Sequence, residues 1–314
     1  MSAETLVIYN ALAGENGKAD PKAALDEFWP GPTDIVRVNT KQIHPDEIKE
    51  YKTVLVWGGD GTVGTVLQQF PDIPVVPLHM GTVGDIAQSL GLGKKLGETQ
   101  GQYLRRVAEM KLGGRIEVLR ICPGLMVFDE NLEERFVWTG GVGASVEVLR
   151  LVETYRNEVK TKIGRTALGA LGYLGQLMIS GPEMDMTLPG GTKHKVIDIN
   201  MINAPFARFG GLPLTCGNSI LWLEKPQSAE EKHYKLAALV VDAGMAKLRS
   251  NFTGKAFQLT RLEEGSFVTV EGPIASFQRD SEINAHTALR MIMKKSDCGD
   301  SFTVSGVKQT AKAE

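Results

Sequence analysis

The sequence predicts an α/β domain followed by a β-rich domain, and two patterns along the chain support this fold class. From Thr5 to Leu90, short apolar segments alternate with segments of helical period, which is typical of a parallel sheet with helices on its faces. After Gly113 and Gly114, short segments of β-rich composition dominate, which is typical of an antiparallel sandwich or barrel. A length of 314 residues with 42% hydrophobic residues suffices for two cores.

The first domain is expected over residues 1–115. Its expected elements, in chain order, are a strand over Thr5–Tyr9, a helix over Pro21–Phe28, a strand over Asp34–Val38, a helix over Pro45–Glu50, a strand over Thr53–Trp57, a helix over Val63–Phe70, a strand over Pro74–Leu78 and a helix over Val83–Leu90. Gly14, the Gly58–Gly59 pair and Gly81 all follow expected strands. Ligands of parallel α/β sheets bind at the carboxyl ends of strands, so a site is expected there.

The second domain is expected over residues 116–288 as a β-sandwich. Its clearest expected strands cover Arg115–Cys122, Phe136–Trp138, Lys195–Met201, Lys255–Leu259 and Ser266–Val270. A helical insertion at about residues 146–179 interrupts them, and the final segment, about residues 289–314, is expected to pack back on the first domain.

Composition excludes several classes of protein. A net charge of −2 and a pI near 6.3 argue against nucleic-acid binding and against a strong electrostatic membrane anchor. No apolar run reaches the ~18 residues of a transmembrane helix, and the first residues lack the features of a signal peptide. The three cysteines, Cys122, Cys216 and Cys298, show no paired spacing, which predicts reduced thiols and a cytoplasmic protein.

The most informative segment is the loop Gly58-Gly59-Asp60-Gly61-Thr62, which follows an apolar strand and precedes a helical pattern. Glycine lets the backbone approach a ligand closely, and the N-terminus of a helix favours a phosphate group. The spacing matches neither the Walker loop nor the dinucleotide fingerprint. The segment therefore indicates a nucleotide-phosphate loop that carries an acid of its own.

This loop resembles the nucleotide loop of the diacylglycerol kinase and sphingosine kinase families, of the NAD kinases and, more remotely, of the phosphofructokinases. Residues 77–91 resemble the second motif of the lipid kinases, with matches at Gly81, Thr82 and Asp85. The NAD kinases have a different second motif, so this segment favours the lipid-kinase branch. Residues 9–14, with Asn10 and Gly14, resemble the opening Asn-Pro-x-x-Gly of that family, although an alanine replaces the proline.

Two later segments extend the resemblance over nearly the whole chain. Asp280 and Glu282 match the acids of a family Asp-Gly-Glu motif, with Ser281 in place of the glycine. Residues 140–145 resemble a family Gly-x-Gly-Phe-Asp-Ala segment, but Ser145 replaces its aspartate. The resemblance implies a three-layer α/β nucleotide domain, as in NAD kinases and diacylglycerol kinases, with a β-sandwich domain after it.

The resemblance also implies ATP as phosphoryl donor and Mg²⁺ as its cation. The nucleotide-binding residues that it implies are Asn10, Gly14, Gly58, Gly59, Asp60, Gly61, Thr62, Gly81, Thr82 and Glu282. Asp60 and Asp85 would bind Mg²⁺ directly or through water. Asp280 is the candidate general base for the acceptor hydroxyl, and Asp60 is the competing candidate.

The expected activity is transfer of the γ-phosphoryl group of ATP to a hydroxyl of a lipid, such as a diacylglycerol, a sphingoid base or a ceramide. The lipid would be met at a membrane surface, on the inner face, and the apolar, glycine-rich residues 166–179 would suit an acyl chain. Whether the protein forms a homodimer is left open.

Two alternatives remain at this point. One is a kinase of a soluble alcohol or a NAD-kinase-like enzyme. The other is a catalytically silent homologue that binds nucleotide or lipid. Gly64, Thr65, Gly84 and Ser145 motivate the silent homologue, because they stand where the family has an asparagine, a glutamate, an asparagine and an aspartate.

Overall fold

The computed structural model describes residues 5–10, 21–29, 33–38, 48, 51, 53–80, 84–95, 97–129, 131–155, 158–159, 162–179, 183–203, 207–209, 212–214, 218–245, 257–280, 282–296 and 301–307. By internal contacts the chain divides into two units, residues 1–121 with 301–314 and residues 122–300. Within the described residues, no helix is both long and apolar enough to span a membrane.

The first unit is built on a six-stranded sheet of order β2-β1-β3-β4-β17-β5. Its strands are β1 (Thr5–Asn10), β2 (Thr33–Val38), β3 (Thr53–Gly58), β4 (Val75–His79), β5 (Ile116–Ile121) and β17 (Phe302–Val307). The strands β1 to β4 run parallel, β17 pairs parallel with β4, and β5 pairs antiparallel with β17. Its helices are α1 (Pro21–Phe28), α2 (Asp60–Gln69), α3 (Asp85–Ser89) and α4 (Gln100–Leu112).

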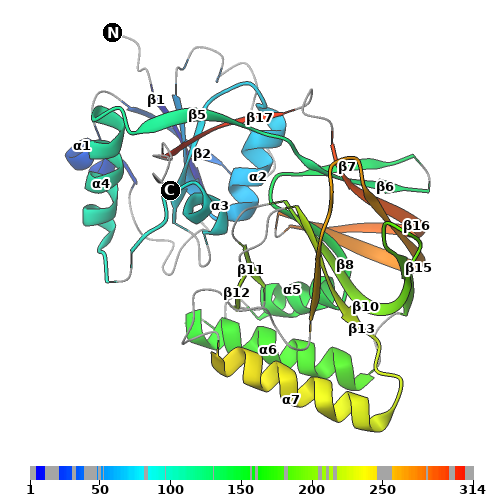
Figure 1. Ribbon diagram of the computed structural model, residues 1–314. Coiled ribbons are helices and arrows are strands. Elements are labelled where there is room, and N and C mark those ends of the chain that lie inside the picture. Colours follow the sequence, from blue (N-terminus) through cyan, green and yellow to red (C-terminus); the bar gives the residue numbers. More distant parts are fainter. Residues whose placement is uncertain are drawn as a thin grey trace, which may run out of the picture. The chain divides into compact units, whose positions relative to one another are not determined.

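The direction of the connections places helices on both faces of this sheet. From β1 the chain passes through α1 to β2 on one side, and from β3 it passes through α2 to β4 on the other side. Because such crossovers are right-handed, α1 and α2 lie on opposite faces, as Figure 1 shows. The residues between Val54 and Trp57 are almost fully buried, as expected for a strand covered on both faces.

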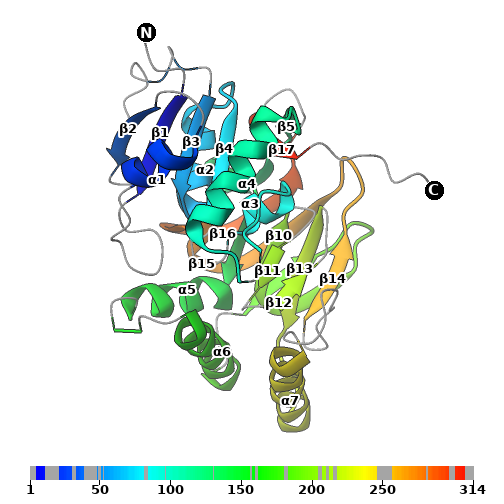
Figure 2. The same ribbon diagram turned by 90° about the vertical axis from the view of Figure 1, so that its left-hand side faces the viewer.

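The second unit is built on a nine-stranded antiparallel sheet, with order β14-β13-β10-β8-β15-β16-β6-β7 and β9 paired to β10 and β15. Its strands are β6 (Gly124–Phe128), β7 (Glu133–Phe136), β8 (Thr139–Gly143), β9 (Met184–Thr187), β10 (Lys193–Ile202), β13 (Ser219–Glu224), β14 (Gln258–Arg261), β15 (Phe267–Arg279) and β16 (Glu282–Lys295). A separate pair joins β11 (Ala207–Phe209) to β12 (Leu212–Leu214). Figure 2 shows β10, β13 and β14 side by side.

One apolar core fills the second unit. Residues from β6, β8, β9, β10, β13, β15 and β16 all belong to it, so strands that are distant in the sheet order meet at one core. Three helices accompany the sheet: α5 (Ala144–Thr154), α6 (Lys162–Ile179) and α7 (Ala229–Met245). Figure 1 shows α6 beside α7, and the two helices are in contact.

The predicted fold class, a parallel-rich α/β unit followed by an antiparallel β unit, is confirmed. The expectation that the strand over residues 115–122 begins the second sheet is wrong, because β5 pairs with β17 in the first sheet. The sequence analysis did not predict α4 or α7. Of the helix expected at Pro45–Glu50, only Ile48 lies within the described residues, and it is fully buried.

The hairpin turn between β15 and β16 carries Asp280, which lies in the left-handed region with φ of 47°, a conformation that aspartate tolerates better than most residues. Its carboxylate accepts hydrogen bonds from the backbone N–H groups of Val137 (2.9 Å), Trp138 (2.7 Å) and Thr139 (3.2 Å). Burial raises the pKa of Asp280 to about 6, against the opposing effect of these three donors. The carboxylate thus fastens the β7–β8 connection to the hairpin.

We expect Asp280→Asn to lower the free energy of unfolding. The new amide N–H₂ would face backbone donors in a site that is only 2% exposed, and an unsatisfied buried polar group costs about 1–3 kcal/mol. Urea denaturation measures the loss. The matched control is Asp185→Asn, an exposed residue of β9, which should change stability by less than about 0.5 kcal/mol. Equal stability of the two variants would contradict this account.

Candidate functional site

A candidate site lies in the first unit, where the strand order reverses between β1 and β3. Such a switch point opens a crevice at the carboxyl ends of the strands. Asn10 ends β1, and its side-chain amide donates a hydrogen bond to Oγ1 of Thr62 in the first turn of α2, over 2.9 Å. Both residues are nearly buried. This bond ties the end of β1 to the start of α2 and leaves the Thr62 hydroxyl engaged with protein.

Gly58 allows α2 to begin directly at the end of β3. A Cβ atom on Gly58 would lie 2.6 Å from Cβ of Thr62, so a side chain there would push α2 away from the sheet. Gly59 is the N-cap residue of α2, and no side chain caps this helix. A helix N-terminus of this kind favours a phosphate group, because its N–H groups and its dipole both attract negative charge.

The Asp60 carboxylate joins the two motifs that the sequence analysis singled out. Its Oδ2 accepts a hydrogen bond from the backbone N–H of Asp85 (3.1 Å), and its Oδ1 accepts one from the N–H of Ile86 (2.9 Å). Asp60 therefore caps α3, which has no cap from its own N-cap residue Gly84. The two strand-end loops that contain Asp60 and Asp85 are held together through this one side chain.

The residues present suit a magnesium ion. Asp60 and Asp85 are carboxylates, and oxygen atoms are the ligands that Mg²⁺ prefers. Across the part of the chain that the structure describes, no three His, Cys, Asp or Glu side chains gather as a metal site. A Mg²⁺ ion at Asp60 and Asp85 would take its other ligands from water and phosphate oxygens, as Mg²⁺ commonly does. Gly14, Gly81 and Thr82 lie outside the described residues.

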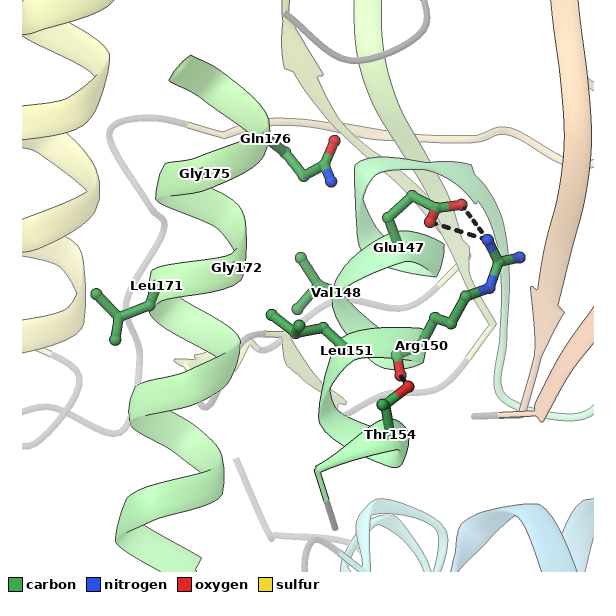
Figure 3. Close-up of a pocket in the computed structure, with 9 residues that line it drawn as sticks. All are labelled: Glu147, Val148, Arg150, Leu151, Thr154, Leu171, Gly172, Gly175 and Gln176. Carbon is green, nitrogen blue, oxygen red and sulfur yellow. Dashed lines mark hydrogen bonds and ion pairs between the residues drawn. The ribbon is translucent and has the colours of Figure 1, made fainter. Parts of the chain in front are cut away.

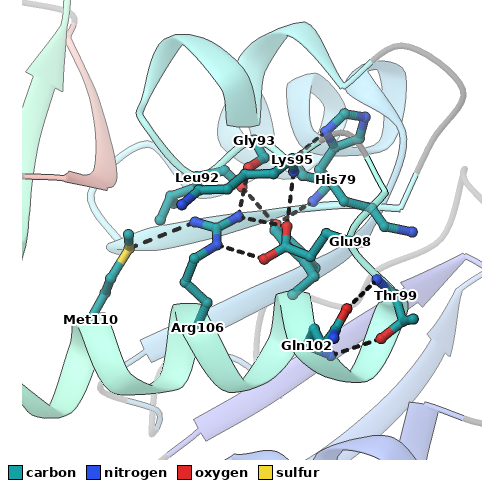
Figure 4. Close-up of polar contacts among 11 residues, drawn as sticks. His79, Leu92, Gly93, Lys95, Glu98, Thr99, Gln102, Arg106 and Met110 are labelled. Carbon is teal, nitrogen blue, oxygen red and sulfur yellow. Dashed lines mark hydrogen bonds and ion pairs between the residues drawn. The ribbon is translucent and has the colours of Figure 1, made fainter.

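A hydrogen-bond network supports the end of β4 (Figure 4). The buried Tyr103 of α4 accepts from the backbone N–H of His79 (2.8 Å) and donates to the carbonyl of Leu92 (2.8 Å). Burial raises the pKa of the Tyr103 phenol, which therefore stays protonated as a donor. The N–H of Lys94 donates to Nδ1 of His79 over 3.0 Å. The sequence analysis missed both His79 and Tyr103, although His79 lies within the second motif, residues 77–91.

An ion pair anchors the same segment to α4. Arg106 contacts Glu98 at 2.8 Å and also donates to the carbonyl of Gly93 at 2.7 Å. The side-chain hydrogen bond from Arg106 lowers the pKa of Glu98. Gly93 and Glu98 are thus fixed on α4, and Lys94, whose backbone contacts the imidazole of His79, follows Gly93 directly.

In the second unit, Asp280 and Glu282 occupy the β15–β16 hairpin. Both oxygens of Asp280 are directed at backbone N–H groups, which suits a structural anchor. Glu282 is half-buried at the start of β16, opposite Arg279.

A buried polar cluster lies at the start of α5, and the sequence analysis did not find it. Oδ1 of Asp198 accepts a hydrogen bond from the backbone N–H of Ser145 (2.8 Å), and Oδ2 accepts one from the Asn200 amide (3.1 Å). Gln278 donates to Asn200. Asp198 is fully buried. A carboxylate therefore contacts the backbone of residue 145, but it comes from β10 and not from residue 145 itself.

A cleft of about 450 Å³ lies between α5 and α6 (Figure 3). Its apolar lining residues are Val148, Leu151, Leu171, Gly172 and Gly175. Glu147 and Arg150 form an ion pair at its edge, with a nitrogen–oxygen distance of 2.9 Å. Arg150 also donates to Oγ of Ser276 on β15. An apolar cleft with a few polar groups is the usual form of a site for an organic ligand.

The glycines of α6 explain why the cleft opens where it does. A Cβ on Gly172 would lie 3.2 Å from Leu151 and 3.3 Å from Val148, so the helices are in tight contact there. One turn further on, a Cβ on Gly175 would meet nothing within 4 Å. The helices separate between these two positions.

Cys122 is disulfide-bonded, so the expectation that all three cysteines are reduced thiols is wrong for this one. Cys216 and Cys298 lie outside the described residues.

The geometry so far describes a parallel α/β unit that has an uncapped helix N-terminus and an acid at its switch point. Residues 4–113 match the family model described as the diacylglycerol kinase catalytic domain. This range contains β1 to α4, with Asn10, Asp60 and Asp85. The match covers about a third of the chain and agrees with the resemblance seen in the motifs of this segment.

Solved structures resemble the whole chain. A Bacillus anthracis (strain Sterne) protein provisionally named a diacylglycerol kinase aligns with a TM-score of 0.61 and 16% identity over 99% of both chains. Another from the same strain, named a diacylglycerol kinase, aligns with a TM-score of 0.55 and 13% identity over 99% of both chains. At these identities the likeness shows the fold alone. No curated protein matches the chain.

We expect Tyr103→Phe to destabilise the first unit, because it removes the partner of the His79 N–H and of the Leu92 carbonyl. Each buried polar group that loses its hydrogen-bond partner lowers the free energy of unfolding by about 1–3 kcal/mol at most. Hydrogen exchange should show faster exchange of the His79 amide. Tyr155→Phe, at a residue that is 41% exposed, is the control. Unchanged exchange at His79 would refute the role of this phenol.

Proposed function

We propose that this protein transfers the γ-phosphoryl group of ATP to a hydroxyl group of a lipid. One observation carries the proposal: Asp60, within the matched catalytic domain, fastens the two motif loops together at the switch point of the sheet. Phosphoryl transfer needs a held nucleotide, a neutralising cation and an aligned hydroxyl. The loop Gly58 to Thr62 would hold the phosphates, with Asn10, Gly14, Gly81 and Thr82 around it.

Mg²⁺, when bound at Asp60 and Asp85, supplies charge neutralisation for the phosphate oxygens. For the general base we favour Asp60 over Asp280. Asp60 is partly exposed, whereas Asp280 is 2% exposed and accepts three backbone hydrogen bonds. Glu282 stays a candidate for contact with the nucleotide.

The acceptor is proposed to be a lipid because the second unit offers an apolar cleft, lined on one side by the glycine-rich α6. Its volume of about 450 Å³ lies within the usual range for organic ligands. The cleft narrows at Gly172 and opens at Gly175, which would suit a chain of methylene groups. The Arg150–Glu147 pair at the edge would be the polar contact for a headgroup.

The proposed location is the cytoplasm, at the inner face of a membrane, because ATP is available there and the lipid would be met there. Disulfides are rare in that compartment, so the oxidation state of Cys122, which is disulfide-bonded in the structure, tests the proposed location. Alkylation of intact cells with a thiol reagent before lysis, followed by mass spectrometry, would test this. A Cys122 that resists alkylation until it is chemically reduced would contradict a cytoplasmic location.

We expect Asp60→Asn to lower phosphoryl transfer about 100-fold or more, the scale of a lost acid–base or electrostatic group. The assay follows γ-labelled ATP with Mg²⁺ and mixed micelles of diacylglycerol, sphingosine or ceramide. Asp72→Asn, an exposed turn residue, is the matched control and should act like wild type. Thermal melting of both variants separates lost chemistry from lost folding.

The products of this assay separate the competing functions. Label in an organic-soluble product supports the lipid kinase. Label in NAD or in a water-soluble alcohol would replace it with a kinase of a soluble acceptor. ATP binding without transfer to any acceptor would identify a silent homologue, which the changes at Gly64, Thr65 and Gly84 motivate.

We expect Gly175→Phe to raise the KM for a long-chain lipid about 10-fold or more and to leave the KM for ATP unchanged. The new ring would fill the cleft, and a Cβ at this position meets no neighbour. Replacing a helical glycine should not lower stability, because glycine costs about 1 kcal/mol relative to better helix formers. Leu289→Phe, at a residue that is 70% exposed, is the control. Unchanged lipid kinetics would exclude this cleft as the acyl site.

A further inference from the structure

The cleft between α5 and α6 presents polar and apolar side chains in different places. Figure 3 shows the Gln176 side chain of α6 directed toward α5, at the end of the cleft where Glu147 lies. Val148 and Leu151 of α5 project toward α6 further along the cleft and belong to its apolar lining. A ligand that fits this arrangement has a polar group at one end and a hydrocarbon chain beyond it.

The two charged residues that line the cleft neutralise each other. Nη1 of Arg150 donates to both carboxylate oxygens of Glu147, over 2.9 Å in each case. Nη2 of Arg150 donates to Oγ of the buried Ser276 on β15, over 3.1 Å. A charged headgroup would lose part of its hydration in the cleft without meeting an opposite charge that is not already paired. The cleft therefore favours an uncharged headgroup.

Gln176 differs from the other polar residues of the lining. Glu147 and Arg150 bind each other, and the Thr154 hydroxyl donates to the carbonyl of Arg150 within α5 over 2.8 Å. The Gln176 side chain has no hydrogen-bond partner in the part of the chain that the structure describes. An amide carries no charge and offers two N–H donors and a carbonyl acceptor, so hydroxyl and ester groups are its matching partners.

The volume of the cleft limits the hydrocarbon that it can enclose. A cavity of about 150 Å³ holds one benzene molecule, with its six carbon atoms. By the same ratio, a cleft of about 450 Å³ encloses roughly 18 carbon atoms. One long acyl chain has this size, and a lipid with two such chains would leave one of them outside. The cleft therefore favours a lipid with a single chain.

We propose that the cleft binds a single-chain lipid with an uncharged, hydroxyl-bearing headgroup, a monoacylglycerol, and that Gln176 hydrogen-bonds to its ester or hydroxyl groups. This inference rests on the proposed function and names its acceptor, a hydroxyl of the glycerol. In the transfer, the hydroxyl oxygen forms a bond to the γ-phosphorus of ATP, and the bond between this phosphorus and the bridging oxygen of ADP breaks. The hydroxyl proton passes to the general base, and ADP leaves.

The first test measures lipid binding by calorimetry without ATP. The probes are 1-lauroylglycerol, dodecylamine and dodecyl phosphate, which share their chain length and differ in the charge of the headgroup. Wild type should bind 1-lauroylglycerol most tightly. Gln176→Met keeps the length of the side chain and removes the amide, so it should weaken this binding by about 2–10-fold, the size of one neutral hydrogen bond. Gln258→Met, at an exposed residue of β14, is the matched control and should bind like wild type.

Two reciprocal variants test the neutralised pair. Arg150→Gln removes the cation that binds Glu147, so the variant should bind dodecylamine about 10-fold more tightly than wild type does. Glu147→Gln leaves the Arg150 guanidinium without its carboxylate, so this variant should gain about 10-fold for dodecyl phosphate. Both gains have the size of a hydrogen bond to a charged group, and a purely structural role of the pair would produce neither.

The kinase assay in mixed micelles then compares 1-oleoylglycerol with 1,2-dioleoylglycerol, and kcat/KM should be about 10-fold or more higher for the single-chain lipid. Transfer that is equally efficient to both lipids would keep the proposed function and overturn this inference. Wild type that binds a charged probe most tightly, or Gln176→Met that binds 1-lauroylglycerol like wild type, would also overturn it. Binding of 1-lauroylglycerol, weakened in Gln176→Met, without transfer to any lipid would support the ligand of the cleft and overturn the proposed function alone.

Discussion

The site in the first unit depends on the pair of hydrogen bonds from Asp60 to the start of α3. Helix α3 has five residues, too few to be stable without support. The first N–H groups of α3 donate to the carboxylate of Asp60, which lies at the start of α2, after the neighbouring strand β3. A negative group at a helix N-terminus also offsets the helix dipole. Asp60, the acid of the candidate site, thus also holds the second motif in position.

Positions at which the chain departs from the family pattern are compensated by neighbours. The ring of His79 fills the space beside Gly84. Asp198 brings a carboxylate to the backbone of Ser145, where the family has an aspartate. Thr65 donates its hydroxyl to the carbonyl of Gly61 within α2, so no polar group is left unsatisfied. At residue 145 a carboxylate is still present, but it comes from Asp198 of β10.

The sequence pattern was sufficient to predict the α/β unit and its switch-point loop. Buried parallel strands and glycine-rich loops can each be recognised from a short segment of sequence. The pairing of β5 with β17 was not predictable from local pattern, since it joins segments about 180 residues apart. The same reason hid Asp198 and Tyr103, whose partners are distant in sequence. The α4 helix could have been found from the capping box of Thr99 and Gln102.

Different physical reasons account for the glycines at different positions of this chain. A side chain at Gly58 would collide with Thr62, and Gly84 lies against His79 and has a left-handed φ of 65°, so packing and backbone conformation account for glycine there. At Gly175 a Cβ would meet nothing, and a glycine inside a helix lowers its stability by about 1 kcal/mol relative to alanine. Packing gives no reason for that cost. The position of Gly175 on the wall of the cleft gives one, because a ligand between α5 and α6 would need the space that a side chain would fill.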